Sequence, residues 1–501
     1  MPKPILSKST YLRGLKCEKS LWLYKNRYKL KDKITPQQEA IFSQGTNVGI
    51  LAQDLFPGGV DASTENYWEI EKGIANTQNM IEQGVTVIYE AAFQFDGVYA
   101  ALDILVKDTK GWKAYEVKSS TSVSETYIDD AAIQYYILTN AGIDLKDISI
   151  VYINNQYVKN GDLDINELFS IESVLAEITN PLAKIPNQIL QFKEVLAKDS
   201  EPKVDIGEHC LNPYECDFMG TCWKHIPEYS VFDISNLRKN KAFELYKNGI
   251  ITFDQIDLEN NNLNTNQLLQ VTSELNNETF IDKENIDLFL NELNYPLYYL
   301  DFETMSSAVP VYDHSRPYQQ LVFQYSLHVQ EIIGGVLTHF EYLAEADPKI
   351  DSRIGFVKQL IDECGTSGDI LVYNISFERG KLNDLMTQFP EYTNQLSSII
   401  ARLKDLMIPF QQKWYYTPEM KGSYSIKYVL PALVPELSYD NLAIKEGGMA
   451  SNTFYQMVIG EFKGYIPKTR KDLLEYCKLD TYGMVRILEK LYLISKRKNY
   501  T

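Results

Sequence analysis

The sequence predicts an α/β (α+β) protein in which two mixed cores are joined by a helical connector. The chain has 501 residues, and at roughly 150 residues per domain this length suggests about three domains. Two segments each combine apolar runs typical of strands with patterns typical of helices. The segment between them is richer in Asn, Leu, Asp and Glu and has helical patterns only. We therefore expect domains at residues 1–227 and 296–501, with the connector at 228–295.

The first core is expected to consist of helices, three strands, a helix and a further strand. Residues up to about 80 favour helices, and Leu51, Leu55 and Phe56 form an apolar helical face before a Pro-Gly-Gly turn. Period-two alternation and turn residues then mark the strands. The strands are expected at 85–95, 98–108, 112–118 and 148–154, with a helix at about 129–140.

The second core is expected to open with an apolar strand that ends in acidic residues, PLYYLDFE at 296–303. Further strands are expected at 320–330 and 369–373. Helical patterns cover 353–363 and 470–495. This alternation of strands and helices predicts a second α/β unit.

Composition argues against several classes of protein. The chain carries 49 Lys and Arg against 67 Asp and Glu, a formal charge of −18, so a broad cationic surface that coats nucleic acid is not expected. A hydrophobic content of 45% argues against a mainly disordered chain. No apolar run approaches the roughly 18 residues that a membrane helix needs. The N-terminus has no apolar core or cleavage site of a signal peptide, so we expect a cytoplasmic protein without a membrane partner.

Polar residues in the strands of the first core form a candidate catalytic site. Asp103 lies in the apolar run AALDILV, where an unpaired charge is costly. Glu116 and Lys118 are two residues apart on the next strand and project to one face. Carboxylates can hold Mg²⁺ or Mn²⁺, and a nearby ammonium can orient water or neutralise a phosphate. Glu90 is a further candidate ligand, and the alternative for the E-x-K pattern is a solvated strand edge.

Asp103, then Glu116-x-Lys118, then a helix bearing Gln134 resembles the RecB-like branch of the PD-(D/E)xK nucleases. The resemblance implies a restriction-endonuclease-like core and metal-dependent cleavage of DNA. Members of that family often carry a histidine metal ligand after a G-x-x-x pattern, but residues 45–49 contain none. We expect that Glu90 or water replaces this ligand, or that the first site is weakened.

Four of the six cysteines belong to the first domain, one early and three late: Cys17, Cys210, Cys216 and Cys222. Six cysteines are too few for a disulfide framework in a chain of this length. The distribution resembles the iron–sulfur RecB-like exonucleases of CRISPR adaptation and the AddB-type repair nucleases, whose four thiolates bind a 4Fe–4S cluster. Thiolates are the usual ligands of such clusters. A zinc site that includes His209 or His225 is the alternative, and a Cys17 that is merely buried is a third interpretation.

The second core carries its own acidic constellation. The run LYYLDFET places Asp301 and Glu303 on one face at a strand end, where two carboxylates can hold two metal ions. YNISFE supplies Glu378 just after a strand, and LEYCKLD places Tyr476 and Asp480 one helical turn apart. The tyrosine can then hold the nucleophilic water beside an ion held by the aspartate. The alternative is an ordinary surface pair on that helix.

D-x-E, N-x-x-F-(D/E) and Y-x-x-x-D, in this order, resemble the three exonuclease motifs of the tyrosine-bearing DEDD branch, which implies an RNase H-like fold over about 297–495. The metal ligands that the resemblance implies are Asp301, Glu303, Glu378 and Asp480. Glu378 stands where that family has an aspartate one methylene shorter, and Asp405 is a candidate substitute or helper. Lys427 in GSYSIK either contacts phosphate or is an exposed lysine at a helix start, and we leave it outside the catalytic set.

The blocks YLDFET, FQYSLH, YNISFE, GSYSIK and YCKLDT together resemble an uncharacterised bacterial family that fuses a RecB-like cysteine-cluster domain to a DEDD-type domain. The resemblances imply a metal-dependent nuclease, an exonuclease, with DNA preferred over RNA as its substrate. The rival hypothesis is a nucleic-acid-binding or assembly protein in which one or both sites are inactive. Cleavage polarity, homo-oligomerisation and a partner protein in repair, CRISPR-like adaptation or phage defence stay open.

Overall fold

A computed structural model describes residues 5–259 and 262–495 of the chain, which divides into two compact units. The first unit extends to His225 and also takes in Ser307–Tyr318. The second comprises Ile226–Ser306 and the chain from Gln319 onward. The helices at 228–295, expected as a connector, therefore belong to the second unit. The predicted mixed α/β architecture is confirmed, because each unit contains a mixed sheet with helices.

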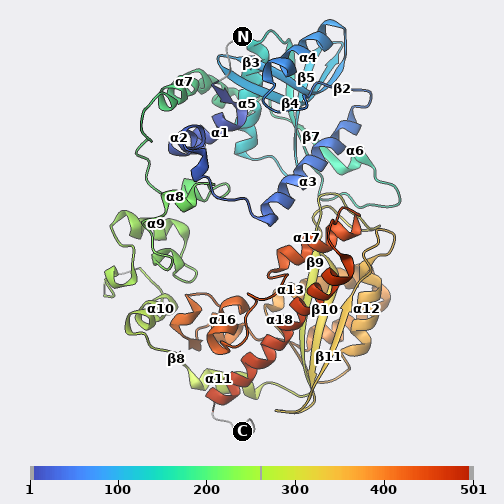
Figure 1. The fold of residues 1–501 in the computed structure, drawn as a ribbon. Helices are drawn as coiled ribbons and strands as arrows, with labels where there is room; N and C mark the ends of the chain where they lie inside the picture. Colours follow the sequence, from blue (N-terminus) through green and yellow to red (C-terminus); the bar gives the residue numbers. More distant parts are fainter. Residues whose placement is uncertain (1–4, 260–261, 496–501) are drawn as a thin grey trace. The chain divides into compact units, whose positions relative to one another are not determined.

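The first unit contains one large sheet and the helices that flank it (Figure 1). Its elements are β1 (Leu6–Ser7), α1 (Lys8–Lys16), α2 (Glu18–Asn26), α3 (Pro36–Ala52), β2 (Val60–Asp61), α4 (Ile70–Glu82), β3 (Val87–Phe95), β4 (Val98–Asp108), β5 (Gly111–Lys118), α5 (Glu125–Asn140), β6 (Leu145–Ile153), α6 (Ile165–Leu168), β7 (Phe169–Ser173), α7 (Thr179–Leu196) and α8 (Met219–Cys222). The strands and the long helix expected after Lys118 are present within a few residues of their predicted bounds.

The sheet of the first unit runs β2-β3-β4-β5-β6-β7, and β1 pairs with β4. β3, β4 and β5 are antiparallel neighbours, whereas β5 and β6 are parallel. A parallel pair needs a crossover, and α5 supplies it between β5 and β6. The buried face of α5, which includes Ala131, Ile133 and Ile137, packs into the main core of the unit. This packing fixes the start of α5 beside the end of β5.

A segment between two strands of the second sheet also belongs to the first unit. Ala308 is buried there in a small core with Val48 of α3 and Ile104 of β4. Tyr318 donates a hydrogen bond to the backbone carbonyl of Ser119, and Lys159 Nζ lies 2.8 Å from Asp313 Oδ1. Residues 307–318 thus complete the first unit from a distant part of the sequence.

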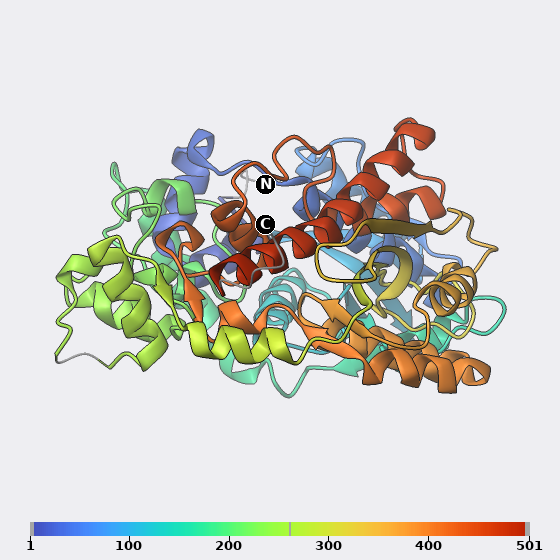
Figure 2. The same cartoon turned by 90° about the horizontal axis from the view of Figure 1, so that it is seen from below.

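The second unit contains a five-stranded sheet, a two-stranded sheet and many helices (Figures 1 and 2). Its elements are α9 (Lys239–Lys247), α10 (Thr265–Asn276), β8 (Phe280–Ile281), α11 (Lys283–Asn291), β9 (Leu297–Met305), β10 (Leu321–Gln330), β11 (Leu337–Leu343), α12 (Ser352–Glu363), β12 (Asp369–Val372), α13 (Ile375–Gln388), α14 (Thr393–Ala401), β13 (Leu403–Asp405), α15 (Ile408–Gln411), β14 (Tyr415–Tyr416), α16 (Ile426–Leu433), α17 (Gly447–Val458) and α18 (Ile466–Ile494). The long helix α18 is drawn in red in both views.

The five-stranded sheet runs β11-β10-β9-β12-β13, with β9 at its centre. β9 is antiparallel to β10 and parallel to β12. Successive side chains of a strand point to opposite faces, and Phe302 packs on Phe356 of α12 with ring centroids 5.0 Å apart. Asp301 and Glu303 therefore project to the other face, where α18 crosses β9 and β10. This alternation brings two acidic side chains under a helix.

The helical region that precedes β9 has a small apolar core of its own, in which Val231, Phe253 and Val271 are buried. Gln270, which is fully buried, donates hydrogen bonds to Tyr229 Oη and to the Asp233 carbonyl. Among the helices of residues 5–259 and 262–495, none combines the length and apolarity required to cross a membrane.

Candidate functional site

The three residues predicted for the first centre lie together at the paired strands β4 and β5. Asp103 Oδ2 accepts a hydrogen bond from the backbone N–H of Val117 at 2.6 Å. Lys118 Nζ donates to Glu116 Oε1 at 2.8 Å. Glu116 is buried, with 2% of its surface exposed, because its side chain turns inward under α5 and α1. The structure thus brings together Asp103, Glu116 and Lys118, the three residues that the sequence spacing singled out.

Two further residues complete this centre, and the sequence analysis missed both. Lys8, the first residue of α1, places Nζ 2.6 Å from Glu116 Oε1 and 3.8 Å from Asp130 Oδ1. Asp130 of α5 accepts a 2.6 Å hydrogen bond from Lys118 Nζ and a 3.0 Å bond from Gln134 Nε2. Asp130 stands four residues before Gln134 on the buried face of a helix, and this spacing was a usable signal. Lys8 carries no local signal, because it precedes Glu116 by 108 residues.

The two buried carboxyls of the first centre, Asp103 and Glu116, have pKa values shifted in opposite directions. Burial and the neighbouring Glu116 raise the pKa of Asp103 to about 8, so this carboxyl tends to hold a proton at neutral pH. Burial opposes ionisation of Glu116 too, but the ammoniums of Lys118 and Lys8 outweigh it and hold its pKa well below the usual value. Glu116 Oε2 is nevertheless buried without a hydrogen-bond partner. That oxygen is an acceptor available to a cation.

Glu90 of β3 lies opposite Asp103, since the register pairs Tyr89 with Ile104 and Ala91 with Leu102. Its backbone has φ of 54°, a left-handed conformation that is strained for a residue with a side chain. Burial raises the pKa of Glu90, while Lys8 acts in the opposite direction. The register opposite Asp103 and the electrostatic influence of Lys8 and Glu116 place Glu90 beside the first centre.

The four cysteines of the first unit line one pocket. Its lining includes Cys17, Cys210, Cys216 and Cys222 together with His209. Cys17 caps the N-terminus of α2 and follows α1 directly, and its sulfur accepts a hydrogen bond from the Ser20 N–H at 3.5 Å. Burial raises the pKa of Cys222 to about 11, and the neighbouring cysteines add to that shift. The alternative zinc ligand His209 lies 3.7 Å from the Cys210 sulfur, whereas His225 is not among the described lining residues.

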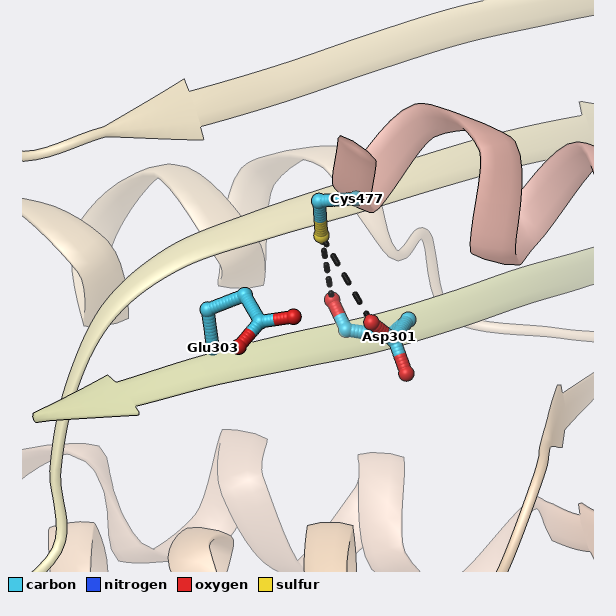
Figure 3. Close-up of side chains that lie close together, drawn as sticks. All are labelled: Asp301, Glu303 and Cys477. Atoms are coloured by element: carbon cyan, nitrogen blue, oxygen red, sulfur yellow. Dashed lines mark hydrogen bonds between the residues drawn. The ribbon is translucent and has the colours of Figure 1, made fainter. Parts of the chain in front are cut away.

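The second centre is built on β9 and α18 (Figure 3). Ligand atoms of Asp301, Glu303 and Cys477 all lie within 4.8 Å of one another. Cys477 Sγ is 3.6 Å from Asp301 Oδ2 and 3.7 Å from the Asp301 carbonyl oxygen. Figure 3 shows the three side chains pointing toward one another from the strand and the helix. The sequence analysis passed over Cys477, although it stands between two predicted site residues.

A tyrosine and a lysine surround the aspartate of α18. Tyr439 donates a 2.5 Å hydrogen bond to Asp480 Oδ1. Lys427 Nζ lies 3.0 Å from the Tyr476 hydroxyl oxygen and 3.9 Å from Asp480 Oδ1. The same ammonium is 3.4 Å from the centroid of the Tyr439 ring. Lys427, which the sequence analysis left outside the catalytic set, therefore belongs to the second centre.

Four carboxyls of the second centre influence one another electrostatically: Asp301, Glu303, Glu378 and Asp480. Burial and then Asp480 raise the pKa of Asp301 well above its ordinary value, and burial and then Asp301 do the same to Glu303. Burial lowers the pKa of Lys427, although the carboxylates act against that shift. Glu378 Oε2 is buried without a hydrogen-bond partner. Among the described residues, this centre buries more carboxyl groups than Lys427 alone could neutralise if all of them were ionised.

Polar residues of β10 hold α18 in place over these carboxyls. Gln324 Nε2 donates to the Leu473 carbonyl at 2.8 Å, and His328 Nδ1 lies 2.9 Å from the Thr481 hydroxyl. Burial lowers the pKa of His328 to about 3, so the ring is neutral and acts as a fixed hydrogen-bonding group. These residues position the helix that carries Tyr476 and Asp480.

Asp405 has a structural role at the start of α13. Its carboxylate accepts hydrogen bonds from the backbone N–H groups of Asn374 at 3.1 Å, Ile375 at 3.1 Å and Met407 at 2.9 Å. Asn374, just before α13, has φ of 84°, so this connection needs support. Asp405 thereby satisfies donors that the helix cannot satisfy itself.

We expect Asp405→Ala to lower the free energy of unfolding of the second unit by about 3 kcal/mol, because three backbone donors lose their charged acceptor. Calorimetric melting of the full chain measures this change. Asp384→Ala, at an exposed position on α13, is the matched control and should cost less than about 0.5 kcal/mol. Equal effects of the two substitutions would contradict the structural role.

Part of the second centre lies in a segment that is similar to a sequence family. Residues 298–425 match the model of a family described as Domain of unknown function (DUF2779). The match includes Asp301, Glu303 and Glu378 but ends before Tyr476 and Asp480.

Similar proteins occur in bacteria that include Ureaplasma and Mycoplasma. "Uncharacterized protein UU173" of Ureaplasma parvum is 28% identical over 253 residues, which cover 45% of this chain and 35% of that protein. "Uncharacterized protein MG366" of Mycoplasma genitalium is 28% identical over 220 residues, or 40% of this chain and 32% of that protein. The chain thus matches about a third of the length of these relatives.

Proposed function

We propose that this protein is a metal-dependent nuclease, with exonuclease chemistry at the second centre. The observation that carries the proposal is the convergence of Asp301, Glu303, Glu378 and Asp480 beside the ammonium of Lys427, the one cation near them among the residues that the structure describes. Such a group of buried carboxyls is costly unless cations bind it. The strand order supports an RNase H-like core for this unit, because β9, β10 and β11 pair antiparallel while β12 and β13 continue the sheet parallel to β9.

The residues of the second centre suit Mg²⁺ or Mn²⁺, because both ions prefer carboxylate oxygens. Asp301, Glu303, Glu378 and Asp480 would hold the ions, and the unpartnered Glu378 Oε2 is one acceptor that an ion would satisfy. Bound ions would lower the pKa of water and neutralise charge on a phosphodiester. Tyr476 would hold the attacking water, and Lys427, at 3.0 Å from the Tyr476 hydroxyl, would orient that hydroxyl and face the phosphate.

For the first centre we propose a PD-(D/E)xK-type site that uses Asp103, Glu116 and Lys118, with Glu90 assisting. One observation favours weak or absent cleavage there. Lys8 places an ammonium 2.6 Å from Glu116, where a metal ion would otherwise be expected to bind. The alternative of an inactive site, at which nucleic acid is bound but not cut, is therefore favoured more at the first centre than at the second.

The cysteine pocket is proposed to hold a 4Fe–4S cluster. Four thiols that line one pocket are a donor set suited to such a cluster, which would connect both ends of the first unit. We expect Cys216→Ser to abolish the visible absorption and most of the iron of anaerobically purified protein. Cys364→Ser, at a buried cysteine of the second unit, should retain both. Colourless wild-type protein that contains zinc would instead support the zinc alternative.

The test of the main proposal is digestion of end-labelled single- and double-stranded DNA and RNA by anaerobically purified protein with Mg²⁺ or Mn²⁺. Laddered products from a labelled end would establish an exonuclease and its polarity. Comparing Asp301→Asn/Glu303→Gln with Glu116→Gln/Lys118→Met assigns the activity to one centre. Failure of the protein to cleave any of these substrates would favour the binding or assembly alternative.

A further inference from the structure

The thiol of Cys477 lies inside the carboxylate centre of the second unit. Its sulfur is 3.6 Å from Asp301 Oδ2, and it is fully buried, with 0% of the residue exposed. Thiolates prefer ions such as Zn²⁺, whereas Mg²⁺ selects oxygen ligands. A thiol at this place therefore changes which ions the centre can accept.

The spacing of these side chains suits a zinc ion. An ion about 2.3 Å from a thiolate sulfur and about 2.0–2.2 Å from a carboxylate oxygen separates the two ligand atoms by about 3.6 Å in a tetrahedral site. The distance from Cys477 Sγ to Asp301 Oδ2 has this value, 3.6 Å. The ligand atom of Glu303 is within 4.8 Å of both. Small side-chain rotations would then complete three corners of the tetrahedron.

A second, independent observation points to a cation at this place. Glu303 is 7% exposed, and its carboxylate is directed toward Asp301 and Cys477 (Figure 3). Among the described residues, it has no hydrogen-bond donor and no ion pair within salt-bridge distance to compensate its burial. Glu378, whose charge also acts on Glu303, has a buried oxygen, Oε2, without a hydrogen-bond partner. Buried carboxylates without donors are expected to bind cations or to hold protons.

We propose that Cys477 is a third protein ligand, beside Asp301 and Glu303, for an ion of the zinc class. Binding forms a metal–sulfur bond and breaks the S–H bond, and the proton passes to solvent. Without such an ion, the thiol donates to Asp301. With Mg²⁺, which avoids sulfur, the thiol stays protonated and the carboxylates bind alone. The centre thus has two binding modes, and the hardness of the ion selects between them.

Cys477 lies between Tyr476 and Asp480 on α18, so a thiolate-bound ion would occupy the region where the proposed nuclease needs its hard ions. The inference rests on the proposed function only for the shared ligands Asp301 and Glu303. It predicts that Zn²⁺ competes with Mg²⁺ for the same centre. Metal binding, unlike cleavage, can be measured whether or not the protein is an active nuclease.

The test is Co²⁺ titration of the full chain, with Co²⁺ as the spectroscopic substitute for Zn²⁺. A thiolate ligand gives a charge-transfer band in the ultraviolet, and the cysteine pocket of the first unit contributes its own band. The decisive quantity is therefore the difference between wild type and Cys477→Ser. We expect Cys477→Ser to remove the thiolate band of the second centre and to weaken Co²⁺ binding at that centre by about 100-fold. The affinity for Mg²⁺ should change by less than about 3-fold.

Cys364→Ser is the matched control, because Cys364 is equally buried in the same unit but belongs to its apolar core. It should leave the Co²⁺ spectrum unchanged. Identical spectra and affinities for wild type and Cys477→Ser would overturn the inference, while metal-dependent cleavage by the same sample would leave the proposed function standing.

Cadmium NMR of the wild-type protein needs no substitution and covers the case in which Cys477→Ser does not fold. The cadmium resonance moves downfield with each thiolate ligand, so a one-sulfur site is distinguishable from a four-cysteine site. We expect a resonance in the range of mixed sulfur and oxygen ligation. Resonances from oxygen-only and four-sulfur sites alone would overturn the inference.

Discussion

Replacing Asp301 with Asn and Glu303 with Gln is expected to reduce exonucleolytic cleavage by at least about 1,000-fold, because the variant loses two of the proposed metal ligands. The same variant should be more stable than wild type when no metal is present. Without a metal ion, each of these carboxyls is buried either as an uncompensated charge or in its protonated form. Burial and the neighbouring acids make the charged form costly. Neutral amides of nearly the same shape avoid that cost.

The expected rise in melting temperature without metal is about 3 °C, since about 1 kcal/mol shifts the midpoint of a unit of this size by a few degrees. Addition of Mn²⁺ should stabilise the wild type but not the variant, because an ion that binds only the folded state raises its stability. Calorimetry with and without Mn²⁺ measures both effects. Cleavage that survives in the double variant would refute the assignment of activity to the second centre.

The matched control for this experiment is Asp362→Asn with Glu331→Gln, which removes the same two charges from exposed positions of the second unit. Cleavage and the Mn²⁺-dependent shift should both persist in this control. If the control also raises the melting temperature, the gain reflects the lower net negative charge of the chain and not the buried centre.

Residues with a local pattern could be predicted from the sequence. Asp301 and Glu303 alternate with apolar residues on one strand, and Tyr476 and Asp480 lie one helical turn apart. Glu116 and Lys118 were found in the same way. The strands and helices that carry them follow from the same periodicities, because each side chain is placed by the geometry of its own element.

Residues that enter a centre from a distant element could not be predicted in this way. Lys8 reaches Glu116 only because β1 pairs with β4 and starts α1 beside the site. Tyr439 reaches Asp480 from a connection between two helices. Lys427 was noticed, but its motif does not say which side chains it contacts. Such contacts depend on tertiary packing, so they cannot be predicted from the local pattern of a single sequence.

Glu116→Gln is expected to destabilise the first unit by about 3 kcal/mol, because it leaves the ammoniums of Lys8 and Lys118 with Asp130 as their remaining partner. Lys8→Met in the same chain should recover about half of that loss, since it removes one of the two ammoniums that would otherwise share Asp130. Calorimetric melting of wild type, both single variants and the double variant gives a coupling energy of about 1–2 kcal/mol. Strictly additive effects would contradict the ion pair between Lys8 and Glu116.

The same lysine decides whether the first centre can take a metal ion. An ion that binds Glu116 must displace the Lys8 ammonium or share the carboxylate with it, so affinity is reduced by the free energy of that ion pair. Lys8→Met should therefore tighten Mn²⁺ binding at the first centre by about 10-fold. The titration uses the Asp301→Asn/Glu303→Gln background, in which the second centre no longer competes. Equal Mn²⁺ affinity with and without Lys8 would contradict this competition. If neither protein binds Mn²⁺ at the first centre, Lys8 is a fixed counterion of a centre that binds no metal, and the first unit would then contribute binding without cleavage.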